Sequence, residues 1–150
     1  MTPRALFRAL ALAETVTWTL LIAGMLLKYV FVLTDVGVSI GGGLHGFVFL
    51  AFAATSVILA VNQRWNLPVT LLALASAVVP YATIPAERWL ERHGHLDGGW
   101  RRVATDHPRD GSAANRLLRW ALAHTALFAV LVAAGVAAVF VGLLVMGPPG

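Results

Sequence analysis

The sequence contains no cysteine, which excludes disulfide bonds, thiolate metal sites and cysteine nucleophiles. Charged residues are also scarce, because Asp, Glu, Lys and Arg together make up only 12% of the 150 residues. The chain is 59% hydrophobic with a mean hydropathy of +0.78, so a soluble form would have to bury almost all of its 16.0 kDa. The composition therefore predicts an integral membrane protein.

The hydrophobic residues gather in four long stretches, and each approaches or exceeds the roughly 20 residues that cross a bilayer core as a helix. These stretches lack the alternating pattern of barrel strands, and a helix satisfies its own backbone groups in hydrocarbon. We therefore expect an all-α polytopic protein, with residues 1–150 as a single transmembrane domain and a proline kink in the third span. The four predicted spans cover residues 9–31, 42–61, 67–85 and 117–146.

The basic residues are ten arginines and one lysine, and they lie at predicted helix ends and in one loop. They form no basic face with interleaved aromatic residues, so we expect no nucleic-acid partner. With four spans, most arginines fall on the side of the 86–116 loop, opposite the termini. The positive-inside rule then predicts this loop in the cytoplasm and both termini outside, in the inner (plasma) membrane of a bacterium.

The 86–116 loop is the stretch with the most soluble character. It opens at Pro85 with a pattern typical of a short interfacial helix. His93, His95 and His107 also lie here. A His-x-His pair can bind a divalent metal, but solvated loop histidines are the alternative, and we expect no metal site.

Five polar residues within or at the ends of the spans are candidates for binding an ion, a proton or a ligand, because ionisable groups are costly inside a membrane. Counting along alternating helices places Glu14 in one half of the membrane and the others in the opposite half. On this count Glu14 and His45 are too far apart to act as a couple. The candidates are Glu14, Lys28, His45, Tyr81 and His124.

Two interpretations of these residues remain open. They could line a proton or ion route, or Lys28 could snorkel to the interface while Glu14 only fixes helix packing. His45 and His124 come from different helices at comparable predicted depth, as axial haem ligands would. A hydrogen-bonded pair is the alternative for the two histidines, and we expect no cofactor.

Several short motifs resemble a family of small bacterial integral membrane proteins, common in actinobacteria, that is known only as a domain of unknown function. The resemblance covers about residues 4–92 and implies three spans that end soon after the position of Glu87. It implies no activity. The motifs are Leu12-Ala13-Glu14 with Trp18, Met25-Leu26-Leu27-Lys28-Tyr29, Leu44-His45-Gly46 with Phe49, Arg64-Trp65, Pro80-Tyr81-Ala82-Thr83 and Glu87, among which Glu14, Lys28, His45 and Gly46 match motif positions.

Two functions from different classes fit the sequence. One is an oligomeric channel or proton-coupled carrier that uses the intramembrane Glu14. The other is a non-catalytic accessory or assembly subunit, whose small-residue faces contact a larger membrane complex. No nucleophile, metal cluster or carboxylate pair is arranged for catalysis, so we do not expect an enzyme.

Overall fold

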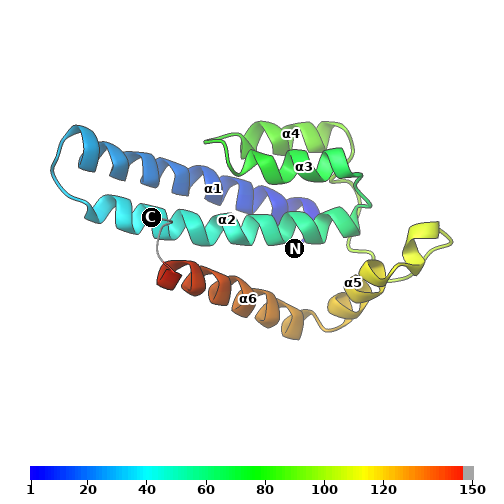
Figure 1. Ribbon diagram of the computed structural model, residues 1–150. Coiled ribbons are helices and arrows are strands. Elements are labelled where there is room, and N and C mark those ends of the chain that lie inside the picture. The colour runs from blue at the N-terminus through cyan, green and yellow to red at the C-terminus, as the bar shows by residue number, and fades with distance from the viewer. Residues whose placement is uncertain (147–150) are drawn as a thin grey trace.

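The structure is a computed structural model that describes residues 1–146 (Figure 1). These residues form helices joined by turns and loops, with no strand among them, so the predicted all-α class is confirmed. The helices are α1 (Pro3–Met25), the π-helix η1 (Leu26–Val30), α2 (Val36–Asn62), α3 (Leu67–Ser76), α4 (Thr83–Arg92), the 3-10 helix η2 (Pro108–Gly111), α5 (Ala113–Ala123) and α6 (Thr125–Met146).

Three helices of the described chain are long and apolar enough to span a membrane. They are Pro3–Val30, which joins α1 and η1, then Val36–Asn62 and Thr125–Met146. They correspond to the first, second and fourth predicted spans. The fourth was predicted to begin at residue 117, but α5 and α6 are separated by a break at His124. Thus α5 is a helix of its own, capped by the Ser112 side chain.

The third predicted span is not a single helix in the structure. Its first part, α3, has 10 residues and is only about 15 Å long, half the thickness of a bilayer core. The chain then turns through residues 77–82, which include Pro80, and returns beside α3 as α4 (Figure 1). Proline therefore marks the end of a helix here and not a kink within one. We call α3, the 77–82 turn and α4 the hairpin.

The predicted interfacial helix at Pro85 exists, but as the second arm of this hairpin. It packs against α1, and its Thr83, Ala86, Glu87 and Leu90 are buried. Its polar Thr83 and Glu87 face protein, whereas Arg88 and Arg92 are exposed, so α4 is a partly buried arm of the hairpin and its predicted interfacial position is not confirmed.

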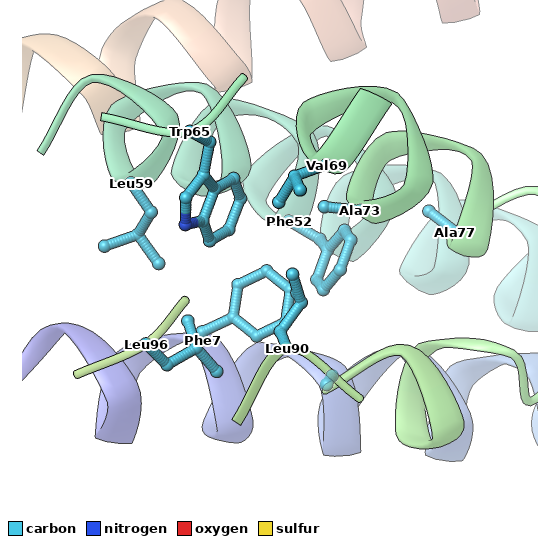
Figure 2. Close-up of a cluster of buried hydrophobic side chains, with 10 residues drawn as sticks. Phe7, Phe52, Leu59, Trp65, Val69, Ala73, Ala77, Leu90 and Leu96 are labelled. Atoms are coloured by element: carbon cyan, nitrogen blue, oxygen red, sulfur yellow. The ribbon is translucent and has the colours of Figure 1, made fainter. Parts of the chain in front are cut away.

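The hairpin is fixed to the long helices by an aromatic cluster near the N-terminal end of α1 (Figure 2). The Phe7 ring lies 5.1 Å from that of Phe52 on α2 and 6.1 Å from that of Trp65, between ring centroids. Leu90 from α4 is fully buried in the same cluster. Burial of these large side chains joins α1, α2 and both arms of the hairpin into one unit.

α1 and α2 run antiparallel and approach closely at their other end, where glycines meet. A Cβ atom added to Gly24 would lie 2.4 Å from the carbonyl carbon and oxygen of Gly37, and one added to Gly41 would lie 2.9 Å from the carbonyl oxygen of Leu20. Backbone atoms cannot move aside as a flexible side chain can. The contact therefore requires glycine on both helices, as in many membrane helix pairs.

We expect Gly24→Ala to destabilise the protein by about 1–3 kcal/mol, because the added methyl would force α1 and α2 apart. The matched control is Gly135→Ala on α6, where an added Cβ meets nothing within 4 Å. Thermal unfolding of both variants in the same detergent measures the difference. Equal stability of the two variants would show that the Gly24 contact does not set the helix spacing.

The predicted topology is wrong, because the 86–116 loop returns to the end of the molecule that holds the N-terminus. Trp100 Nε1 donates a hydrogen bond to the Met1 carbonyl at 2.9 Å, and the Arg64 guanidinium lies 2.7 Å from the Asp110 carboxylate. The hairpin enters and leaves at the same end, so it does not carry the chain across. All ten arginines belong to segments that meet at this end, which we call the arginine end, whereas Lys28 lies near the opposite end of α1 and η1.

Candidate functional site

Glu14 and His45 form a pair between α1 and α2. The distance from Glu14 Oε2 to His45 Nδ1 is 3.0 Å, and the Glu14 side chain is fully buried while that of His45 is 13% exposed. The prediction that these residues lie in opposite halves is therefore wrong. The reason is that α2 begins at Val36 and not at residue 42, so His45 lies about 14 Å into the helix instead of at its opening.

The pair lies well inside the apolar part of the molecule. Arg8 and Lys28 bracket an apolar stretch of α1 and η1 about 30 Å long, the thickness of a bilayer core. Glu14 is about 9 Å from the Arg8 level along the helix axis. A carboxyl group at this depth cannot reach water by extending its side chain, unlike a lysine near a helix end.

Thr17 completes the site from the same face of α1, one turn after Glu14. Its hydroxyl oxygen lies 3.1 Å from the Glu14 carbonyl oxygen, 3.4 Å from Glu14 Oε2 and 3.4 Å from His45 Nδ1. The single hydroxyl proton can serve one of these acceptors at a time. The arrangement therefore offers several hydrogen-bond patterns with small movements of atoms.

Aromatic rings hold the imidazole in place. The Trp18 ring centroid lies 4.3 Å from that of His45, and the Phe49 ring lies at 6.1 Å on the next turn of α2. Trp18 Nε1 in turn donates to the Ala77 carbonyl at 3.2 Å, which links the site to the turn of the hairpin. His45 is thus fixed between a carboxylate and an aromatic face.

One oxygen of the buried carboxyl group remains without a partner. Glu14 Oε1 has no hydrogen-bond partner among the described residues, although Oε2 is within bonding distance of His45 and Thr17. An unpaired buried oxygen is costly for an ionised carboxylate. A proton on Glu14, shared with or passed from His45, would remove that cost.

A row of threonines lines the contact between α1 and the hairpin on the neighbouring face. Thr83 Oγ1 donates to the Ala11 carbonyl at 3.0 Å and lies 3.4 Å from Thr15 Oγ1. Farther along α1, Thr19 Oγ1 donates to the Tyr81 hydroxyl at 3.4 Å. Polar contacts therefore continue along α1 to the turn of the hairpin.

The structure separates the remaining candidates from the pair. Lys28 lies in η1, with its ammonium 5.4 Å from the centroid of the Tyr29 ring. Tyr81 lies in the hairpin turn with a positive φ of 64° and is 43% exposed. His124 lies at the break between α5 and α6, at the arginine end. The sequence predicted His124 in the other half of the membrane, at the same depth as His45, and this prediction is wrong.

The arrangement required of a haem-binding pair is not present. His45 contacts Glu14 and Thr17, while His124 Nδ1 is 3.0 Å from the Trp120 carbonyl of its own helix. In the loop, the His93 and His95 rings stack on Trp89. The described residues contain no group of three or more potential metal ligands.

A polar network centred on Asp110 lies at the arginine end, and it was not predicted from the sequence. Its side chain is 3% exposed, and Oδ1 accepts from Arg64 Nη2 at 2.7 Å and from Arg101 Nη1 at 2.8 Å. Oδ2 accepts from the Thr105 backbone N–H at 2.8 Å and from its hydroxyl at 2.9 Å. The Thr105 N–H and the Arg64 guanidinium hold the pKa of Asp110 far below its usual value of 3.8, against the opposing effect of burial.

Arg101 carries this network to α2 and α5. It donates to the carbonyls of Val61 and Asn62 at the end of α2, and to Asn115 Oδ1 on α5 at 2.8 Å. Burial lowers the pKa of its guanidinium, Arg64 acts in the same direction, and Asp110 opposes both. We call these contacts of Asp110 and Arg101 the arginine network. It ties the loop after α4 to the long helices.

Comparison with known proteins identifies the first part of the chain. Residues 4–92 match the family described as Domain of unknown function (DUF3817). A protein of Streptomyces coelicolor, named as a candidate membrane protein, is 42% identical over 91 residues, which are 60% of this chain. The aligned segment spans only 11% of that relative's length. No solved structure matches the chain significantly.

The matched range contains the whole of the Glu14 and His45 site together with the hairpin, and it leaves out the loop after α4, α5 and α6. The expected resemblance to a family known only as a domain of unknown function is confirmed. Over more than half of its length, this chain belongs to the DUF3817 family of unknown function.

Proposed function

We propose that this protein is a small proton-coupled carrier or channel in which Glu14 and His45 form the proton-binding site. The observation that carries the proposal is the 3.0 Å contact between the fully buried Glu14 Oε2 and His45 Nδ1. A charge at this depth costs several kcal/mol, so ionisable residues inside membranes are found at proton and ion pathways more often than on lipid-facing surfaces. The pair can hold a proton on either partner while staying neutral overall.

The hairpin turn supports a transport role. Trp18, which binds the Ala77 carbonyl, lies near the middle of the apolar stretch of α1, so the turn lies at similar depth. Irregular backbone at membrane depth is tolerated where it is covered by protein or lines a water-filled cavity. Val78, Val79 and Tyr81 of this turn are exposed in the single chain. We infer that a neighbouring subunit covers these mostly apolar side chains.

We propose a homo-oligomer as the working unit, because one chain of this size encloses little volume. α6 is the surface available for assembly, since Val136 is its one buried residue in the described chain. It carries two rows of small residues at four-residue spacing, and such rows allow close approach of another helix. We propose the row Ala134, Ala138 and Gly142 as the contact with another subunit. The other row is Ala129, Ala133 and Ala137, and its Ala129 and Ala133 line a groove toward α2 of the same chain.

The arginine end fixes the orientation that we propose. Ten arginines meet at this end, and Lys28 alone among basic residues lies at the other. The positive-inside rule places the N-terminus, the hairpin ends and the arginine network in the cytoplasm, and the turn between η1 and α2 outside. The membrane is the plasma membrane of a bacterium. Protease accessibility of the 93–107 loop in inverted and right-side-out vesicles checks this orientation.

Proton flux tests the function directly. The protein is reconstituted into liposomes that contain a pH-sensitive dye and potassium, and valinomycin sets the membrane potential. We expect potential-driven acidification faster than in protein-free liposomes and faster than with heat-inactivated protein. If the folded, reconstituted protein leaves the proton leak unchanged at every potential, the channel form is contradicted. If the leak also stays unchanged when solute gradients are present, the carrier form is contradicted.

A second candidate, an accessory or assembly subunit without catalytic activity, is favoured by a different observation. In the Streptomyces coelicolor relative the similar segment is a small part, 11%, of a much longer chain. A unit of this kind can serve a larger membrane assembly, here as a separate polypeptide. Extraction in mild detergent and mass measurement distinguish the two functions: a stoichiometric foreign partner supports the subunit, and a homo-oligomer that carries protons supports the carrier.

A further inference from the structure

An apolar groove runs between α2 and α6 on the side of α2 away from the hairpin. It has a volume of about 580 Å³ and its lining is mostly aliphatic and aromatic. The floor is a stripe of α2 from Phe47 to Ile58, and one wall is α6 from Thr125 to Val136. Each stripe is about 17 Å long, so the groove follows the helix axes for half of a bilayer core.

The groove is closed at the end away from the arginines. There the Phe140 ring of α6 lies 5.9 Å from the Phe47 ring, and its edge would be 3.5 Å from a Cβ on Gly46. α6 therefore reaches α2 at this point, where glycine leaves room for the ring. At the other end α5 joins the helices through the buried Leu118 and Leu122. Between these two contacts α2 and α6 stand apart.

Polar residues occur at the arginine end of the groove. Arg102 and Trp100 both line it, and Arg102 is exposed. Arg102 Nη1 donates to the Leu122 carbonyl at 3.0 Å, which holds the guanidinium beside the opening. Tryptophan and arginine side chains at a membrane boundary are typical of headgroup level. The groove thus combines an apolar channel of half-membrane length with a cation at its headgroup end.

We propose that this groove binds one acyl chain of an anionic phospholipid from the leaflet at the arginine end, with the lipid phosphate at Arg102. Apolar residues in the groove match the chain, and the positive charge at its end matches the phosphate. A zwitterionic lipid fits the groove but adds a choline or ammonium group next to a region rich in arginine. This inference goes beyond the proposed proton transport and does not depend on it.

Thermal unfolding of the delipidated protein with added lipid tests the proposal. Phosphatidylglycerol and phosphatidylcholine of the same chain length are titrated in detergent, and native mass spectrometry counts the lipids retained. We expect one retained phosphatidylglycerol and a preference of about fivefold over phosphatidylcholine, as one arginine at the surface supplies. Inorganic phosphate alone should not stabilise the protein, and stabilisation by phosphate would overturn the requirement for an acyl chain.

Variants separate the two parts of the site. Arg102→Gln should remove the preference, Arg102→Lys should keep it, and Arg92→Gln, on α4 outside the groove, should leave it unchanged. Ala129→Trp should fill the groove and remove the retained lipid of either kind. Equal preference in wild-type protein and Arg102→Gln, or a retained lipid in Ala129→Trp, would overturn the proposal in favour of ordinary annular lipid.

Discussion

Glu14→Gln is expected to reduce proton flux to the rate of protein-free liposomes, while the variant folds and assembles as the wild type does. Glutamine has nearly the same shape as glutamic acid, and its amide can still bond to Thr17 and His45. It cannot take up or release a proton near neutral pH. The change therefore removes the proposed chemistry and leaves most of the packing in place. Dye acidification in liposomes measures the flux, and size-exclusion chromatography checks the assembly.

The matched control is Glu87→Gln on α4, since Glu87 is also a buried carboxyl group with an unpartnered oxygen but is not part of the pair. It should retain flux. Infrared difference spectra between acidic and alkaline buffer provide a readout apart from transport, because the signal of one titrating carboxyl should disappear in Glu14→Gln. Loss of the folded protein on Glu14→Gln would instead assign a structural role to Glu14, and flux equal to wild type would exclude it as the proton site.

Asp110→Asn is expected to cause the largest loss of stability among changes at the arginine end. The substitution leaves Arg64 and Arg101 beside each other without their shared carboxylate, and removing one partner of a buried ion pair is far more harmful than removing an exposed one. We expect the midpoint of thermal unfolding to fall by about 5–10 °C. Asp106→Asn is the control, since Asp106 is an exposed acid in the same loop. Equal midpoints for the two variants would mean that the network adds nothing to stability.

The pH dependence of this effect follows from the pKa of Asp110, which is lower in the folded protein than its usual 3.8. A group with a depressed pKa stabilises the folded state fully above its usual pKa and loses this contribution as the pH falls toward the folded value. The difference in midpoint between wild type and Asp110→Asn should therefore be constant from pH 5 to 8. It should shrink when the pH is lowered below about 4. A difference that grows on acidification would contradict the assignment.

Hydrophobicity predicted the membrane class and three of the spans, because each of these helices satisfies its own backbone groups and needs only length and apolar composition. The same criterion failed at residues 67–85. That stretch is apolar enough to cross, but Pro80 ends the helix and the buried Thr83 and Glu87 bring the chain back against α1. A hydropathy pattern cannot distinguish a span from a hairpin that packs on its neighbours.

The candidate site was only partly predictable. Polar residues inside apolar helices singled out Glu14 and His45 as candidates, since a charge in hydrocarbon is costly. Their pairing depended on the starting residue of α2, and the predicted span of residues 42–61 began six residues too late. Asp110 could not have been found, because its arginine partners come from distant parts of the chain and become neighbours only through the return of the hairpin.

The hairpin also determines how this family segment can be joined to other membrane domains. Residues 4–92 cross the apolar region twice, with α1 and α2, and the hairpin adds no crossing, so the segment starts and finishes at the same end. A segment with an even number of crossings can be joined to either end of another membrane domain without inverting the orientation of that domain. In this chain α6 adds one crossing and makes the total odd, which takes residue 146 to the end opposite the arginines. Adding one helix to the family segment is thus enough to change the side of the membrane on which a following segment would begin.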